Sequence, residues 1–161
     1  MRGLEYKGDE YDFSPEELSN VIIEDDLLYE HKTVRINYTT YDLRREEETI
    51  KPGNHADIMV LADEEGENAH PYWYSRVIGI FHVNATLRTK DEDAEQYDLL
   101  WVHWFAREAG KAGWKARRLR RLTLFDLEDE DAFGFIDPKH VIRGVHLIHD
   151  DARLYTYYLN M

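Results

Sequence analysis

Residues 107–121 concentrate basic side chains within an acidic chain. This segment holds seven bases and one acid, Glu108, and Trp114 lies inside it. Its candidate nucleic-acid contacts are Lys111, Trp114, Lys115, Arg117, Arg118, Arg120 and Arg121. Basic residues interleaved with an aromatic ring suit phosphate contacts together with base stacking. The same basic face could instead bind an acidic protein surface, such as the chain's own residues 126–131. It could also simply be a solvated surface, and these alternatives stay open here.

The eight histidines raise the question of a metal site. His140, His146 and His149 lie close in sequence, but the i, i+3 spacing of the last two places them on opposite faces of a strand. The chain has no H-E-x-x-H motif or similar ligand set. We therefore predict no metal and no other cofactor. We interpret His103, in the middle of a strongly apolar segment, as a core or rim histidine with satisfied hydrogen bonds.

Side chains suited to covalent catalysis are scarce. The serines are Ser14, Ser19 and Ser75, and there is no cysteine. No Gly-rich phosphate loop and no nucleophile elbow occurs. Carboxylates are so frequent that a pair of them carries no information. We therefore expect a protein that binds a partner and does not catalyse a reaction.

Length and composition indicate one globular domain. The chain has 161 residues, of which 43% are hydrophobic and 13% aromatic, enough to bury a core. Its longest apolar runs are strand-sized, so we expect no membrane span. The first residues show no secretory signal, and the lack of cysteine suits an intracellular protein.

The net charge of -13 is spread unevenly. Residues 1–30 hold ten acids and two bases, a net charge of -8. We therefore predict an acidic N-terminal extension over residues 1–30, with one short helix. The acidic balance argues against unspecific coating of DNA and favours a basic partner such as a histone tail.

Local patterns predict one helix and a series of strands. Ser14, Pro15 and Glu17 form a helix start with a capping box, and the helix is expected over residues 16–23. Residues 51–54 read as a turn. Alternating or β-branched runs predict strands over residues 33–41, 57–62, 72–83, 97–107, 122–127 and 141–148, with an edge strand over 155–159. Such an order favours a mainly β, small antiparallel barrel with short peripheral helices.

Four segments, in order, resemble strands of bromo-adjacent homology (BAH) domains. Residues 71–81 are similar to the second core strand, and residues 100–107 to the apolar-x-Trp-Phe-x-Arg strand. Residues 122–126 and 136–148 resemble the two that follow. The resemblance implies an SH3-like, BAH-like barrel over residues 31–150, followed by a C-terminal edge strand or tail over residues 151–161.

A second resemblance covers much of residues 33–161. Residues 37–45, 70–81, 113–119 and 133–148 are similar to the C-terminal region of transposon-encoded, transposase-like proteins of mushroom-forming fungi. This resemblance implies a nuclear function in association with chromatin or DNA. It does not name a ligand.

The BAH resemblance also implies a binding site. Some BAH domains read methylated lysine in an aromatic cage, and by segment the walls here would be Trp73, Trp104 and Phe125, with Glu108 or Asp126 adding negative charge. Aromatic faces attract a quaternary ammonium, although large aromatic residues serve more often as core.

Three functions therefore follow from the sequence. The first is a chromatin-associated module that binds a histone tail, methylated or not, or another basic peptide. The second is a nucleic-acid-binding module of transposon origin that contacts DNA through the basic segment. The third is a protein–protein docking module without a ligand pocket.

Overall fold

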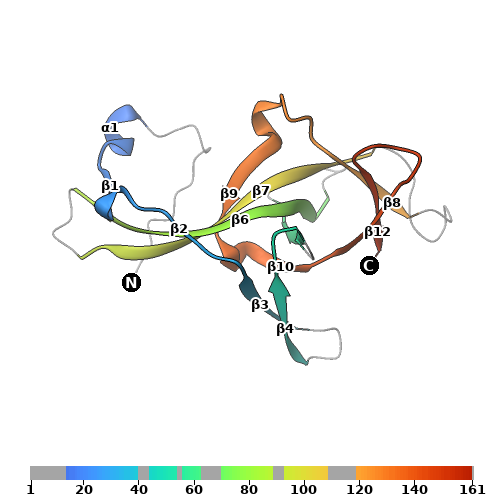
Figure 1. The fold of residues 1–161 in the computed structure, drawn as a ribbon, viewed down its shortest axis with the longest axis horizontal. Helices are drawn as coiled ribbons and strands as arrows, with labels where there is room; N and C mark the ends of the chain where they lie inside the picture. The colour runs from blue at the N-terminus through green and yellow to red at the C-terminus, as the bar shows by residue number, and fades with distance from the viewer. Residues whose placement is uncertain are drawn as a thin grey trace. The chain divides into compact units, whose positions relative to one another are not determined.

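A computed structural model describes residues 14–39, 44–53, 56–62, 70–88, 93–108 and 119–160. These residues form a mainly β, antiparallel fold (Figure 1). The chain divides into two compact units. One unit contains the described residues up to Leu28 together with those of Val83–Tyr97, and the other contains those of Tyr29–His82 and from Asp98 onward.

The first unit begins with the predicted capping box. Helix α1 (Pro15–Leu18) starts after Ser14, whose Oγ accepts the N–H of Glu17 while Ser14 N–H donates to the Glu17 carboxylate at 2.9 Å. The Ser14 hydroxyl also donates to this carboxylate at 2.9 Å, and the hydrogen bonds from the Ser14 backbone and side chain lower the pKa of Glu17. The predicted helix is wrong beyond Leu18. Val21–Ile23 forms strand β1, because this β-branched run pairs with the end of β6 (Tyr72–Leu87).

A ten-stranded antiparallel sheet joins most of the strands. Its hydrogen-bonded path runs β10-β5-β6-β7-β8-β12-β11, with β1 and β2 paired to β6 and β9 paired to β7. The strands at the ends of this path come from the C-terminal part of the chain: β10 is Val141–Gly144, β11 is His146–His149 and β12 is Thr156–Asn160. The central strands are β5 (Asp57–Leu61), β6 (Tyr72–Leu87), β7 (Glu95–Arg107), β8 (Arg120–Leu124) and β9 (Phe133–Ile136), and β2 is Tyr29–Glu30. The strands predicted over residues 57–62, 72–83, 97–107 and 122–127 are confirmed, with boundaries shifted by up to four residues.

Strands β3 (Val34–Thr39) and β4 (Arg45–Ile50) form a separate two-stranded ribbon (Figure 1). The sequence predicted β3 but not β4, because Arg45–Ile50 is rich in glutamate and lacks a clear apolar alternation. The predicted turn follows at Pro52 and Gly53, whose φ of 84° is the left-handed conformation that glycine tolerates.

The C-terminal strands differ from prediction in two ways. The segment predicted as one strand is split at Val145 into β10 (Val141–Gly144) and β11 (His146–His149). Strand β12 (Thr156–Asn160) is not an edge strand, since β8 and β11 pair with it on either side. The strand path ends at β10 and β11, and among the described strands no pairing closes it, so the predicted SH3-like, BAH-like barrel is not confirmed.

Apolar side chains gather in two core clusters. The first includes Ile58 and Val60 of β5 with Leu100 and Val102 of β7, and Ile36 of the ribbon covers it. The second cluster consists of Met59, Tyr74, Phe105, Leu122 and Leu159. Because successive residues of a strand face opposite sides, β5 contributes to both clusters. In the described part of the chain, no helix is long and apolar enough to span a membrane.

Candidate functional site

Strands β7 and β9 present a row of aromatic side chains on one surface. Trp101 pairs in register with Phe135, and His103 with Phe133. Trp101 stacks on Phe135 with ring centroids 6.4 Å apart and lies 6.0 Å from Phe133. Leu100 and Val102 point the other way, into the first core cluster. We call Trp101, His103, Phe133 and Phe135 the aromatic face.

Two rings of the aromatic face are open to solvent. Trp101 is 39% exposed and Phe135 is 53% exposed. Exposed large apolar side chains that adjoin one another commonly mark a surface that binds a partner. Cross-strand contacts hold these two rings in place, so they can bind with little loss of side-chain entropy.

His103 is the buried member of the aromatic face and is 8% exposed. Its ring stacks on Phe133 at 4.6 Å, and its Nε2 lies 2.9 Å from the carbonyl oxygen of Phe125. Because a carbonyl oxygen can only accept, Nε2 carries the proton. The prediction of a satisfied core or rim histidine is confirmed.

An acidic segment, residues 126–131, runs between Phe125 and the start of β9. Its five carboxylates, all on exposed residues, are Asp126, Glu128, Asp129, Glu130 and Asp131. His103 contacts a residue on either side of this segment. It is hydrogen-bonded to the Phe125 carbonyl and stacks on Phe133. The segment is therefore held beside the aromatic face, where its negative charge favours a cationic ligand.

The structure brings together two walls of the cage that the resemblance implied. Trp73 of β6 and Trp104 of β7 meet edge to face, with ring centroids 5.9 Å apart and planes at 78°. Trp104 is half-buried and packs against the first core cluster. A Cβ at Gly134 would lie 2.9 Å from Trp104 Nε1, so the indole passes close over the β9 backbone. Trp104 therefore packs as a core residue, whereas Trp73 remains 39% exposed.

The remaining cage candidates lie nearby but are otherwise engaged. The Phe125 N–H donates to the carbonyl oxygen of Trp104 at 3.1 Å, which is a backbone contact. Glu108 binds Arg121 at 2.7 Å and Arg153 at 3.1 Å, so both of its carboxylate oxygens have a cationic partner. Asp126 is exposed and accepts the N–H of Glu128.

Most of the basic segment lies outside the described residues. Lys111, Trp114, Lys115, Arg117 and Arg118 all fall there. Of the two candidates on β8, Arg120 is half-buried, and the side chain of Arg121 is 15% exposed and paired with Glu108. Arg121 therefore already binds a carboxylate of its own chain.

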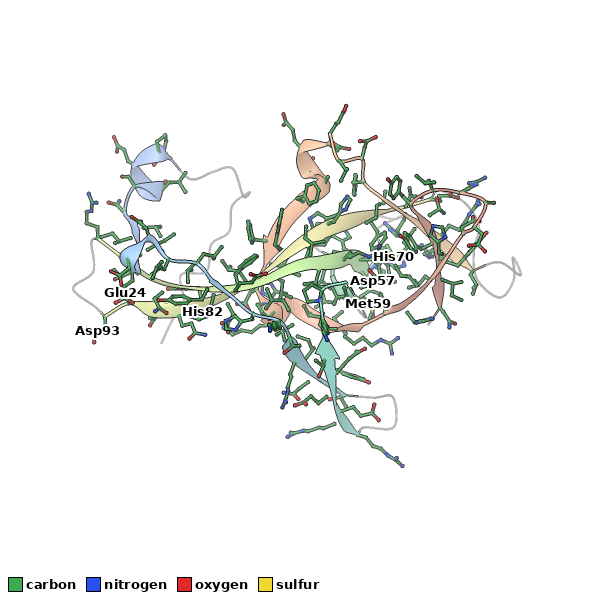
Figure 2. The ribbon with its side chains drawn as sticks, viewed as in Figure 1. Glu24, Asp57, Met59, His70, His82 and Asp93 are labelled. Carbon is green, nitrogen blue, oxygen red and sulfur yellow. The ribbon has the colours of Figure 1, made fainter. Side chains whose placement is uncertain are left out.

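Histidine pairs occur without the ligands of a metal site. His82 on β6 (Figure 2) stacks on Tyr29 and on His31, and its Nδ1 lies 2.6 Å from His31 Nε2. His149 lies 3.5 Å from Asp151. Within the described residues, no group of three or more histidine, aspartate or glutamate side chains could hold a metal ion.

Sequence reasoning missed Trp101, Phe133 and Phe135 as candidate site residues. Two signals were present: the alternation of the β7 segment puts Trp101 opposite the core residues, and Phe133 and Phe135 are two positions apart. What the sequence could not show is that β9 pairs with β7, because that pairing joins residues thirty or more positions apart.

Comparisons with known proteins do not assign this chain to a family. No family model matches the sequence, and no curated protein and no solved structure matches it.

Proposed function

We propose that this protein is a non-catalytic binding module for a basic, lysine-bearing peptide, and that a histone tail is the partner. The observation that carries the proposal is the aromatic face, with two solvent-exposed rings beside an acidic segment of five carboxylates. Both features favour the same ligand chemistry, a cation on a flexible chain.

The aromatic face supplies the attraction for the cation. An ammonium group over the face of a tryptophan gains about 0.5–2 kcal/mol, more where water is excluded. Trp101 offers one such face, and Phe135 stacks beside it and extends the apolar surface. Methylation of the lysine would increase its apolar contact and keep its charge, so a methylated tail suits this surface at least as well.

The acidic segment determines which class of macromolecule fits. Five carboxylates repel the phosphates of a nucleic acid and attract lysine and arginine side chains. At this face a basic peptide is therefore favoured over DNA. DNA contact through the basic segment stays a separate prediction, and so does the nuclear location that either partner requires.

The aromatic face suits the role better than the Trp73–Trp104 pair. Trp104 is held by the first core cluster and by its approach to Gly134, so it cannot adjust to a ligand without disturbing the sheet. Trp101 makes its ring contacts with β9 alone among the described residues and stays open to solvent.

The BAH-like barrel belongs to the same proposal. Val145 separates β10 from β11 by a single residue, and these two strands are the ends of the hydrogen-bonded path. The chain thus links both ends of the sheet directly. In a barrel, the first and last strands of the sheet are neighbours. A direct chain connection between the two end strands therefore supports a barrel-like arrangement of this unit.

The test measures binding of lysine-rich histone-tail peptides, unmethylated and trimethylated, by fluorescence anisotropy. Trp101→Ala is expected to weaken binding about tenfold, and Trp73→Ala to leave it unchanged. The opposite pattern would move the site to the cage of Trp73, Trp104 and Phe125. Binding that neither substitution changes, or no binding at all, overturns the proposal. Thermal unfolding of both variants shows that each is folded.

The same experiment separates the nucleic-acid alternative. Double-stranded DNA replaces the peptide, and the salt concentration is varied. Binding to DNA that weakens steeply with salt, and that survives Trp101→Ala, would favour the basic segment as the functional site.

A further inference from the structure

A polar cleft of about 290 Å³ opens on the second unit, and no residue of the aromatic face lines it. Strands β3, β4, β5, β10, β11 and β12 all contribute to its lining. The side chains that matter for its chemistry are Tyr38, Glu48, Asp57, Arg143, His146 and Asn160. Since His146 and Asn160 are register partners on β11 and β12, they lie side by side.

The two carboxylates of the cleft already have partners. Asp57, labelled in Figure 2, accepts two hydrogen bonds from Arg76, at 2.7 Å and 3.1 Å. Glu48 accepts the N–H of Gly144 at 2.9 Å. A Cβ at position 144 would lie 2.5 Å from the Glu48 carboxylate, so a larger residue there would make this flexible side chain shift.

Tyr38 is also engaged. Its hydroxyl donates to Glu46 at 3.0 Å, and this hydrogen bond raises the pKa of the phenol. The hydroxyl therefore stays protonated and is committed to a carboxylate outside the cleft.

In contrast to Asp57, Glu48 and Tyr38, Arg143 has no partner for its side chain among the described residues. Within the part of the chain that the structure describes, its guanidinium makes no ion pair and no hydrogen bond, although the residue is half-buried. The register of β10 shifts between Val141 and Arg143, as it does at a β-bulge or another irregularity of the ladder. Bulges redirect side chains and are frequent beside functional sites. A bound anion would supply the partner that this guanidinium lacks among the described residues.

We propose that this cleft binds a carboxylate anion, with the guanidinium of Arg143 as its fork-shaped donor and the Asn160 amide and His146 as neighbouring polar groups. The planar guanidinium can give a carboxylate two parallel hydrogen bonds. The site does not depend on the aromatic face, so its test can succeed or fail independently of the peptide-binding proposal.

The lining favours a carboxylate over a phosphate. Both anions match the geometry of arginine, but a phosphate brings more negative charge close to Glu48. A single carboxylate, such as a peptide terminus or an aspartate or glutamate side chain, places one charge opposite Arg143 and adds less repulsion.

The test is an NMR titration of the full chain with acetate, succinate and inorganic phosphate at constant ionic strength, with chloride as the reference. Saturable shifts of the Gly144, His146 and Asn160 amides with the two carboxylates are expected. Shifts that do not saturate, or that match those with chloride, overturn the proposal. Phosphate binding more tightly than either carboxylate overturns the assignment of ligand class.

Two variants and a control locate the site. Arg143→Gln is expected to weaken carboxylate binding about tenfold or more, since it removes both the charge and the paired hydrogen bonds. Arg143→Lys keeps the charge without the fork and should weaken binding by a smaller factor. Arg35→Gln, which removes an exposed cation paired with Glu47, should have no effect. Equal affinity in wild type and both Arg143 variants would overturn the proposal.

Discussion

The imidazole of His103 stacks on the ring of Phe133, with centroids 4.6 Å apart and planes at 27°. The two residues are register partners on β7 and β9. Through the same ring, His103 also contacts the Phe125 carbonyl, so one side chain fixes where the acidic segment leaves β8 and where it enters β9. If the proposed function is correct, His103 is a positioning residue for binding even though it is buried.

Replacing His103 with phenylalanine tests this positioning role. His103→Phe keeps a ring to stack on Phe133 but loses the hydrogen bond to the Phe125 carbonyl. We expect the free energy of unfolding to fall by about 1–2 kcal/mol, because a partly buried carbonyl loses its donor. Peptide affinity should fall as well, because the acidic segment is less firmly held. Urea unfolding and peptide titration measure the two effects, and His140→Ala, at an exposed position, is the control.

A substitution at Gly134 tests how closely Trp104 packs on β9. Gly134→Ala places a methyl group 2.9 Å from Trp104 Nε1, and we expect a loss of about 1–3 kcal/mol of stability from overpacking. The same substitution in a Trp104→Phe background should cost less, since the smaller ring does not reach the new methyl group. A double-mutant cycle by chemical denaturation measures this difference. Equal costs in both backgrounds would mean that Trp104 does not pack on Gly134.

The buried phenol of Tyr74 leads us to expect that the protein loses stability at high pH. Its ring is buried, and among the described residues its hydroxyl has no hydrogen-bond partner. Burial raises the pKa of this phenol. The folded state thus keeps the proton that the unfolded chain releases above pH of about 10, so the protein loses stability as the pH rises through that range.

Tyr74→Phe should reduce this alkaline loss. At neutral pH its free energy of unfolding should be unchanged or higher by about 1 kcal/mol, because an unpaired buried hydroxyl is removed. Tyr157→Phe is the matched comparison, since that hydroxyl accepts a hydrogen bond from Arg76 at 3.0 Å and its loss should destabilise. Urea unfolding at pH 7 and pH 10.5 distinguishes the two variants. A larger alkaline loss in Tyr74→Phe would contradict the prediction.

Arg76 joins β5, β6 and β12 through one guanidinium. It binds both oxygens of Asp57 and lies over the rings of Phe105 and Tyr157, at 5.4 Å and 4.7 Å. Burial by itself lowers the pKa of Arg76, but the hydrogen bonds to Asp57 and Tyr157 outweigh it and the pKa is raised. The side chain is therefore firmly charged.

Arg76→Lys should cost about 2–3 kcal/mol, because the point charge of lysine keeps neither the paired hydrogen bonds nor the stacking. The estimate is at the lower end for a buried pair, since both side chains are partly exposed. Lys139→Ala removes an exposed pair with Asp137 and should change stability by less than about 0.5 kcal/mol. Thermal unfolding of the two variants gives the comparison. A similarly small change in stability in both variants would show that the contacts of Arg76 contribute little to the stability of the fold.

Several local features could be read from the sequence because they depend on neighbouring residues. Ser14 and Glu17 form a capping box within one turn, and Gly53 follows Pro52 in a turn that needs a positive φ. The alternation around Leu100 and Val102 identifies a strand and its buried side. The mainly β class followed from the number of such segments.

The candidate site depended on the tertiary structure. Trp101 and Phe135 are ordinary strand residues until β9 pairs with β7, and Arg143 lines a cleft because residues of five other strands lie around it. Strand β12 likewise lies inside the sheet because β8, far away in sequence, pairs with it. The sequence by itself determined where strands form and which side of each is apolar. Which strands become neighbours was decided by long-range hydrogen bonds and shared burial, which no local pattern encodes.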